Sequence, residues 1–244
     1  MNTSKTMLAL AGALLLALPT ASRADTQDYT PVKFNQTENP AFPKSLITAG
    51  LRSGAASIAV AVDENGKLTD YLITAYSHPA FAESALASLK KWTFEPMRIH
   101  GAPRNSKTDL TFRFEVEGTV VVSMSALEST DLIRFRVAPG SEAYSALRPQ
   151  QLSHAPRPTK VVNPAYTREL ARASHGGRVN VEFYIDELGH VRMPSVSRET
   201  NETNEDLAAM VVSTMAQWEF EPPVSEGKPV LVRAQQSFNF KGTN

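Results

Sequence analysis

The chain contains no cysteine among its 244 residues and carries no net charge at neutral pH. Without cysteine, disulfide scaffolds, thiolate metal sites and cysteine nucleophiles are excluded. Lysine plus arginine equals aspartate plus glutamate at 25 each. No long-range attraction therefore draws the chain to nucleic acid or to an anionic membrane surface, and we expect no nucleic acid among its partners.

Recognised catalytic and metal-binding spacings are also missing. The acidic pairs Asp63-Glu64 and Asp186-Glu187 precede glycines, where aspartate serves turn formation. No nucleophile elbow, phosphate-cradling loop or dinucleotide fingerprint occurs. We expect a protein that is not an enzyme and holds no metal or cofactor, since an enzyme would need distant residues that converge in the fold. No histidine has a partner at the spacing of a known metal motif; the five are His78, His100, His154, His175 and His190.

A long apolar run covers residues 7–18, near the N-terminus. It follows Lys5 and leads to Ser22-Arg23-Ala24, with small residues where a signal peptidase cleaves. This pattern predicts a cleavable export signal over residues 1–24 and a location in the periplasm. The alternative is an uncleaved segment that anchors the protein in the inner membrane, although the run is shorter than the roughly 20 residues that a spanning helix needs.

Two stretches of the chain match each other without a gap. Trp92-Thr93-Phe94-Glu95-Pro96 recurs 126 residues later as Trp218-Glu219-Phe220-Glu221-Pro222. Upstream of these stretches, Asn39-Pro40-Ala41-Phe42 recurs 124 residues later as Asn163-Pro164-Ala165-Tyr166. A duplicated module explains both matches. The same pairing at 126 residues joins Phe81 with Leu207, Ala85 with Val211, Gly101 with Gly227 and Phe114 with Phe240.

The repeat predicts an α+β protein of two tandem modules, each ordered α-β-β-α-β. Apolar side chains of residues 56–62 alternate with small ones, as in a central strand. Asn65-Gly66 predicts a tight hairpin with positive φ at both residues. Pro194 marks the second strand of the second module as an edge, so the last strand lies on the other side with an open outer edge. We expect helices at 40–50, 79–92, 164–173 and 204–218, and strands at 55–62, 67–75, 109–116, 179–186, 191–197 and 229–240.

These elements divide the chain into six segments. Val120-Val121-Val122, and Ile133, Phe135 and Val137, predict one or two extra strands that have no counterpart in the second copy. Residues 139–162 contain four prolines and one glycine, which indicates a linker. The segments are a signal peptide (1–24), an extended arm (25–38), the first module (39–117), the extra strands (118–138), the Pro-containing linker (139–162) and the second module (163–244).

The combined motifs resemble the C-terminal domain of TonB-family energy transducers, present as two tandem copies. Members of this family fold as a three-stranded antiparallel sheet with helices on one face, and they bind partners by adding a strand beside the last strand. The motifs that carry the resemblance are Asn163-Pro164-Ala165-Tyr166, residues 177–183, the Asp186-x-x-Gly189 hairpin, Leu207-Ala208-Ala209, Trp218-x-Phe220-x-Pro222 and Gly227-x-Pro229-Val230.

The resemblance implies a binding edge for N-terminal segments of TonB-dependent outer-membrane receptors. Carried over by position, that edge comprises Val230, Leu231, Val232, Arg233, Ala234, Gln235, Gln236 and Ser237. Asn163 corresponds to a polar residue near the receptor segment, and its alternative role is to form a turn or to cap a helix. The aromatic motif residues Trp92, Phe94, Phe183, Trp218 and Phe220 are expected in the core.

The implied function is that of a non-enzymatic periplasmic protein that binds extended segments by strand addition, accessory to TonB-dependent transport. A full transducer has a membrane anchor and a long proline-rich spacer, whereas residues 24–39 extend at most about 50 Å, so we do not expect energy transduction by the protein alone. The alternative is an envelope structural or assembly protein whose edge strands pair with each other, within one chain or between two copies. Residues 118–137 are the candidate cover for the first module.

Overall fold

The computed structural model describes residues 29–117, 120–124, 129–132, 143–173, 176–197, 200 and 204–242. The predicted signal peptide lies outside these residues, as do the expected strand residues Ile133, Phe135 and Val137. None of the helices in the described ranges is both long enough and apolar enough to cross a membrane.

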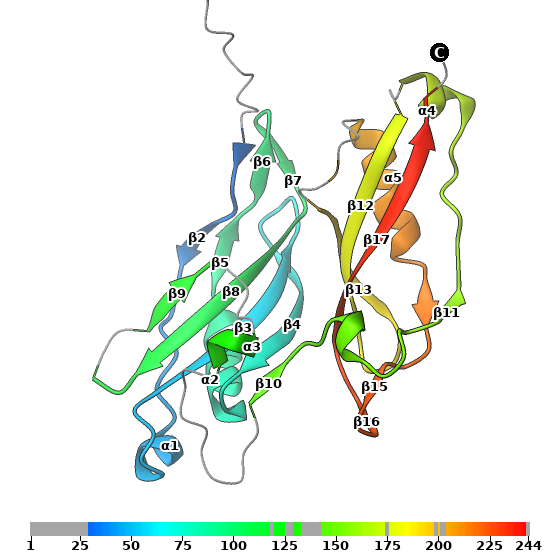
Figure 1. The fold of residues 1–244 in the computed structure, drawn as a ribbon. Coiled ribbons are helices and arrows are strands. Elements are labelled where there is room, and N and C mark those ends of the chain that lie inside the picture. Colours follow the sequence, from blue (N-terminus) through cyan, green and yellow to red (C-terminus); the bar gives the residue numbers. More distant parts are fainter. Residues whose placement is uncertain are drawn as a thin grey trace, which may run out of the picture.

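The first module follows the predicted order, but its sheet has five strands where three were expected. The strand order is β10-β4-β3-β8-β9, and all pairs are antiparallel. The predicted three-stranded unit β4-β3-β8 is extended on both edges by short strands from residues 121–145 (Figure 1). The elements are α1 (Lys44–Thr48), β3 (Ser53–Val62), β4 (Leu68–Tyr76), α2 (Pro79–Leu89), β8 (Ser106–Glu115), β9 (Val121–Ser123), α3 (Ser129–Leu132) and β10 (Tyr144–Ser145).

The second module has the predicted sheet order β13-β12-β17, with β12 in the centre. Pro194 lies in the edge strand β13, next to Met193, whose φ of 49° accompanies a register shift against β12. A proline is tolerated there because an edge strand at a bulge does not need its N–H. The elements are η1 (Pro149–Gln151), α4 (Arg168–Ala173), β12 (Gly176–Ile185), β13 (Val191–Val196), α5 (Glu205–Met215) and β17 (Val232–Lys241).

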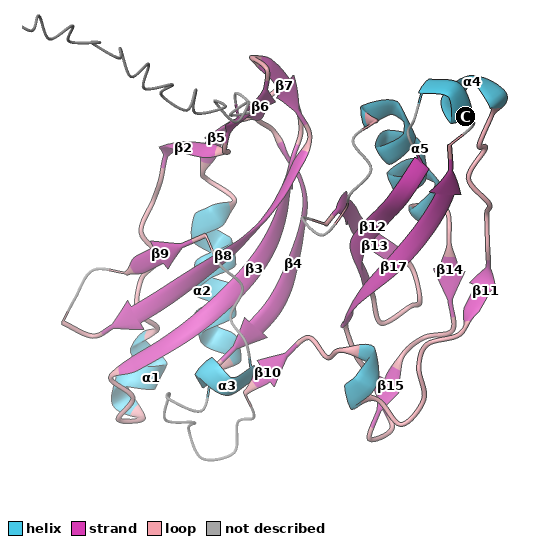
Figure 2. Cartoon of the chain, turned by 45° about the horizontal axis from the view of Figure 1, so that its top comes forward, coloured by secondary structure: helices cyan, strands magenta, loops and turns pink. Residues whose placement is uncertain are grey.

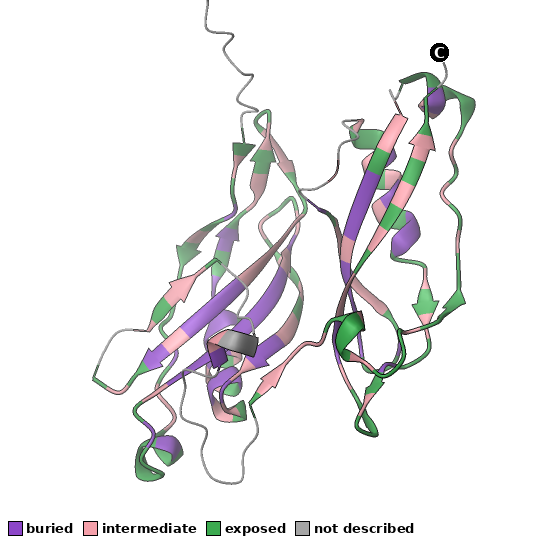
Figure 3. Cartoon of the chain, in the orientation of Figure 1, coloured by how far each residue is buried: buried purple, intermediate pink, exposed green. Residues whose placement is uncertain are grey.

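Each sheet buries one face against a single long helix (Figure 3). In the first module Phe81 and Leu89 of α2 pack with Ile58 and Phe112 of the sheet. In the second, Leu207, Val211 and Met215 of α5 pack with Val179 and Val181 of β12. The spacing of three and four residues on each helix and of two on each strand places these side chains on facing surfaces.

The hairpin between β3 and β4 differs from the prediction, because only Gly66 has a positive φ, at 79°. Asp63 forms the turn: its Oδ1 accepts from the N–H groups of Asn65 at 2.9 Å and Lys67 at 2.8 Å. The second module repeats this arrangement at Asp186, which accepts from Leu188 and His190, and Gly189 has a φ of 89°. An aspartate that accepts from two backbone groups favours a five-residue turn over a two-residue one.

In both modules the tryptophan indole holds the segment that enters the module. Trp92 Nε1 donates to the carbonyl of Glu38 at 2.9 Å, and Trp218 Nε1 donates to the carbonyl of Val162 at 2.8 Å. Both carbonyls precede the Asn-Pro-Ala motif. The helices α1 and α4 begin four residues after Pro40 and Pro164, later than predicted. Pro43 before α1 has an extended backbone, and before α4 the Tyr166 N–H closes a turn on the Pro164 carbonyl at 2.9 Å.

Short strand pairs show that the structural repeat begins upstream of the Asn-Pro-Ala motif. β2 (Lys33–Gln36) pairs with β5 (Thr93–Glu95), and β11 (Pro158–Lys160) pairs with β14 (Glu219–Phe220). In each module a hairpin with positive φ at its turn also precedes the last strand. These hairpins are β6 (Met97–Ile99) with β7 (Ala102–Arg104), which β1 (Tyr29–Thr30) joins, and β15 (Val224–Ser225) with β16 (Lys228–Pro229).

The helix-free faces of the two sheets meet between the modules (Figure 2). Tyr184, Met193 and Leu231 of the second module pack on Ala59 of β3. The small residues of β3 thus make room for the second module, because they let large side chains approach its backbone. The buried Tyr184 hydroxyl donates to Asp109 at 3.2 Å, and burial raises the pKa of this phenol.

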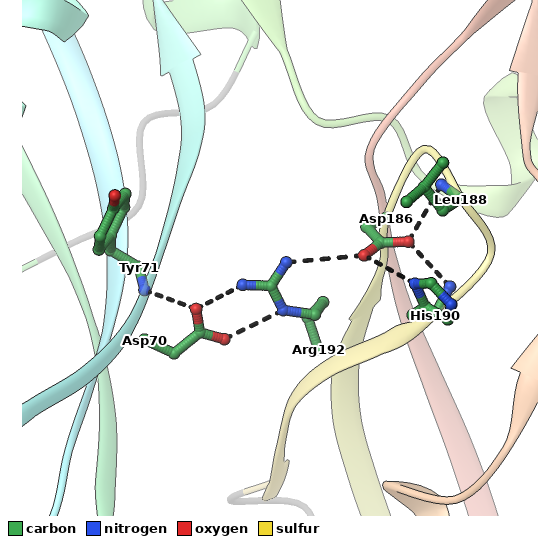
Figure 4. A network of polar contacts seen from close by, with 6 residues as sticks. All are labelled: Asp70, Tyr71, Asp186, Leu188, His190 and Arg192. Carbon is green, nitrogen blue, oxygen red and sulfur yellow. Dashed lines mark hydrogen bonds and ion pairs between the residues drawn. The ribbon is translucent and has the colours of Figure 1, made fainter.

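A polar network links the modules at one end of this contact (Figure 4). Arg192 of β13 reaches Asp70 of β4 through two hydrogen bonds, one of them 3.1 Å long. The same guanidinium lies 3.6 Å from Asp186. The hairpin aspartate of the second module therefore shapes its own turn and orients the arginine that contacts the first module. Paired guanidinium and carboxylate groups of this kind fix orientation through their fork geometry.

Candidate protein-binding edge

The outer edge of β17 ends the sheet of the second module. In the described part of the chain no further strand lies against it. The side chains of β17 alternate between the two faces of the sheet. The even-numbered ones face α5, because Val232, Ala234 and Phe238 pack with the core cluster. The odd-numbered residues have their side chains on the opposite face.

The start of this edge is occupied by the chain itself. Leu147 N–H donates to the carbonyl of Leu231 at 2.9 Å, and Arg233 N–H donates to the carbonyl of Leu147 at 2.8 Å. These bonds form an isolated parallel bridge between Leu147 and Val232. They also show that odd-numbered residues of β17 point their backbone N–H and C=O outward, since ladder bonds alternate between the two edges of a strand.

The C-terminal end of β17 is also contacted by another part of the chain, Tyr166. Tyr166 Oη donates to the carbonyl of Lys241 at 2.8 Å, and its ring packs on Phe240 with centroids 4.8 Å apart. Between Leu147 and Tyr166, Ser237 and Asn239 present their backbone N–H and C=O groups at the exposed edge. A strand rises about 3.4 Å per residue, so residues 235–239 offer a length of roughly 14 to 17 Å.

The residues assigned to the binding edge lie in three places: before β17, beside Leu147, and beyond the Leu147 bridge. Val230 and Leu231 precede β17, and Leu231 is buried in the contact between modules. Val232 and Arg233 lie beside Leu147. Ala234, Gln235, Gln236 and Ser237 lie beyond that bridge. Asn239 does too, and the carried-over range omitted it although the alternation up to Phe240 marks the strand as longer.

Asn163 is exposed and follows Val162, whose carbonyl the Trp218 indole holds. It lies in a segment without regular secondary structure before α4, with Pro164 next. Of the aromatic motif residues, Trp92, Phe94 and Phe183 are buried, and Trp218 and Phe220 are half-buried against the core of the second module.

The matching edge of the first module is paired. β9 covers β8 through Thr111 with Ser123, Phe112 with Val122, and Arg113 with Val121. On the other side of that sheet, β10 pairs with β4. The two copies of the module therefore differ at the last strand, since β9, which has no counterpart in the second, covers residues 111–113 of β8 in the first.

No cluster of three potential metal ligands lies among the described residues. Of the histidines that the structure describes, His190 is the one that lies near a carboxylate, with its Nδ1 3.5 Å from Asp186. Asp186 is already engaged by the turn and by Arg192. The chemistry that these residues offer is backbone pairing and ion pairing.

Known proteins match the same two stretches that form the modules. The family model described as Gram-negative bacterial TonB protein C-terminal matches residues 38–116 and 162–241. Among solved structures, the chain is similar to the solution NMR structure of the Pseudomonas aeruginosa TonB C-terminal domain, with 32% identity over 36% of this chain and 88% of that chain and a TM-score of 0.31. No curated protein matches the chain. Because the family model covers more than half of the sequence in two stretches, this protein belongs to the TonB C-terminal domain family and contains the domain twice.

Proposed function

We propose that this protein is a non-enzymatic TonB-like protein of the periplasm that binds extended segments of other proteins by adding them to the outer edge of β17. The observation that carries the proposal is the difference between the copies: β9 covers residues 111–113 of the last strand in the first module, and β17 ends the sheet in the second. An exposed strand edge is a template for another chain.

The length of the uncovered edge of β17 limits how tightly a peptide can bind. Residues 235–239 allow a partner of about five residues, and each backbone hydrogen bond contributes about 0.5–1.5 kcal/mol net. Ordering the partner segment costs free energy as well. We therefore expect weak binding, with a dissociation constant in the micromolar to millimolar range, suited to a transient role accessory to TonB-dependent transport.

A proline at position 237 tests the edge directly. Ser237→Pro removes an outward N–H, while the inward bonds to β12 come from the even-numbered residues. The control is Ser237→Ala, which keeps the N–H and removes only the hydroxyl that donates to Asn180 at 2.6 Å. We expect Ser237→Pro to weaken peptide binding at least about fivefold and Ser237→Ala to leave it nearly unchanged.

Binding is measured by NMR titration with synthetic peptides from the N-terminal segments of outer-membrane receptors. Shifts are expected at the amides of Ser237 and Asn239 and not at those of β8, which β9 covers. The absence of any shift at millimolar peptide would count against strand addition.

A second candidate is an assembly role in which the β17 edges of two copies pair with each other. The observation that favours it is that the first module already closes its edges with the chain's own strands, and an open edge tends to self-associate. Slow hydrogen exchange at Ser237 and Asn239, together with a dimeric mass in partner-free protein, would support self-pairing. Fast exchange in a monomer would support an edge that is available to other proteins.

A further inference from the structure

The segment that occupies the start of the β17 edge also pairs with the first module. This segment, residues 144–147, is called the strap here, and it runs from β10 to the residue before η1 (Figure 1). Its first two residues form β10, which pairs antiparallel with β4. The Ala146 N–H then donates to the Thr74 carbonyl of β4 at 2.6 Å. The next residue, Leu147, is bonded to β17, so adjacent residues of the strap attach to different modules.

The strap lies where a bound strand would lie. The Leu147 N–H donates to the Leu231 carbonyl at 2.9 Å, and its carbonyl accepts from the Arg233 N–H at 2.8 Å. A residue with both bonds stands one strand spacing, about 4.8 Å, from β17. A partner that pairs with the whole edge, residues 231–239, therefore cannot bind while Leu147 is in place.

The exchange of Leu147 for a longer partner conserves hydrogen bonds at β17. Leu147 forms an isolated bridge, so its hold on the edge comes from the two bonds to Leu231 and Arg233. An added strand makes the same two bonds and continues along residues 235–239. What opposes the exchange is the attachment of the strap to the first module.

Displacement of Leu147 has to disturb that attachment. Consecutive Cα atoms are 3.8 Å apart, and a partner strand needs about 4.8 Å beside β17. Leu147 cannot clear this space without pulling Ala146 from the Thr74 carbonyl. The strap is also held by packing: Ala146 and Tyr144 lie against the cluster between the modules, and the Tyr144 ring stacks on Tyr76 with centroids 5.3 Å apart.

We infer that the strap is an autoinhibitory contact: it shortens the binding edge of β17, and a long partner segment binds fully only by displacing Leu147 and releasing β10 from β4. This inference rests on the proposed strand addition and adds its regulation. Binding at the second module is thereby coupled to the sheet edge of the first, since the same four residues cannot satisfy β4 and yield β17 at once.

The test uses three capped peptides from one receptor N-terminal segment: a five-residue core, and the core extended by four residues at either end. The strap lies at one end of the edge, so only one of the extended peptides reaches residues 231–234. Dissociation constants are measured by NMR titration of the full chain. We expect all three to agree within about threefold in the unmodified protein, because the extra bonds are offset by those that Leu147 loses.

A proline at position 147 removes the inhibition. Leu147→Pro replaces the N–H with a ring carbon that collides with the Leu231 carbonyl. We expect one extended peptide to bind at least about fivefold more tightly to this variant, the factor for two backbone hydrogen bonds at the low end of their range. Binding of the five-residue core should not change. The control Ala155→Pro places a proline at an exposed residue of the same linker, outside the strap, and should change none of the affinities.

Hydrogen exchange tests the coupling without any substitution. At saturating concentrations of the extended peptide that gains affinity in Leu147→Pro, the amides of Leu147 and Ala146 should exchange faster in the unmodified protein than without peptide. The five-residue core should leave both amides protected. Protection of Ala146 reports the first module directly, because its partner is the Thr74 carbonyl.

The outcomes separate this inference from the proposed function. If the peptides shift the amides of Ser237 and Asn239 but Leu147→Pro brings no gain, or Ala155→Pro brings the same gain, strand addition stands and the strap is refuted as an inhibitor. If Ala146 stays protected under the extended peptide, release of β10 is refuted. If none of the peptides shifts the Ser237 and Asn239 amides at millimolar concentration, strand addition itself is refuted at this edge.

Discussion

Two turn glycines of the second module are expected to lose very different amounts of stability when each is replaced by alanine. Gly189 and Gly227 have similar φ values of 89° and 78°. A Cβ atom at Gly189 would lie 2.1 Å from the carbonyl oxygen of Phe220, whereas one at Gly227 meets nothing within 4 Å. Replacing each by alanine therefore introduces the same backbone strain, and only Gly189→Ala adds a clash with backbone.

The magnitudes follow from these geometries. A left-handed conformation costs a residue with a Cβ about 1–2 kcal/mol, which is the whole expected effect of Gly227→Ala. Gly189→Ala must also move the hairpin away from Phe220, whose N–H donates to the Gly189 carbonyl at 2.8 Å. Loss of that bond adds about 1 kcal/mol. We expect a loss of roughly 3 kcal/mol, or about 12–24 °C in melting temperature for a module of this size.

Urea unfolding followed by tryptophan fluorescence measures both variants. The chain has one tryptophan in each module, so a Trp92→Phe background leaves Trp218 as the reporter of the second module. The first module offers a matched pair, because a Cβ at Gly66 would lie 2.3 Å from the Phe94 carbonyl oxygen and one at Gly101 meets nothing within 4 Å. Equal losses of stability for Gly189→Ala and Gly227→Ala would refute the reasoning.

Three further predictions concern contacts within and between the modules. A double-mutant cycle of Arg192→Ala and Asp70→Ala, measured by urea unfolding, is expected to give a coupling energy of about 1 kcal/mol, since both side chains are about a third exposed. Trp218→Phe removes the bond to the Val162 carbonyl and is expected to cost about 1–2 kcal/mol, measured by urea unfolding followed by circular dichroism because the variant lacks the Trp218 fluorophore. Burial raises the pKa of Tyr144 to about 12; because the unfolded phenol ionises near pH 10, stability should fall between about pH 10 and 12, and a Tyr144→Phe variant should show a smaller fall.

Local patterns were sufficient for the element order and for the position of the second module's edge strand. Apolar spacing along α2 and α5 reflects which face each helix buries, and Pro194 excludes a central strand because it lacks an N–H. Turn geometry was harder to predict. Asn65-Gly66 is typical of a two-residue hairpin, but the side chain of Asp63 accepts from two backbone groups and stabilises a longer turn.

Contacts between distant segments could not be predicted in the same way. Leu147 lies in a segment without strand periodicity, yet it bridges β17 and occupies the beginning of the expected binding edge. A single bridge of this kind depends on where the linker returns to the sheet. Likewise, Arg148, Arg178 and Arg233 come from separate segments of the chain, and only the folded chain gathers them around one surface hollow.

The sequence by itself determined that a module is repeated, because the spacing of its tryptophan, proline and glycine residues records the same turns and helix faces twice. The tertiary structure decided which copy has an open edge and how the copies meet. The small side chains Ala55 and Ala59 of β3 are compatible with any close neighbour, and only the folded chain places Leu132 and Tyr184 against them. Side-chain size limits what can approach a strand, whereas the path of the whole chain determines what does.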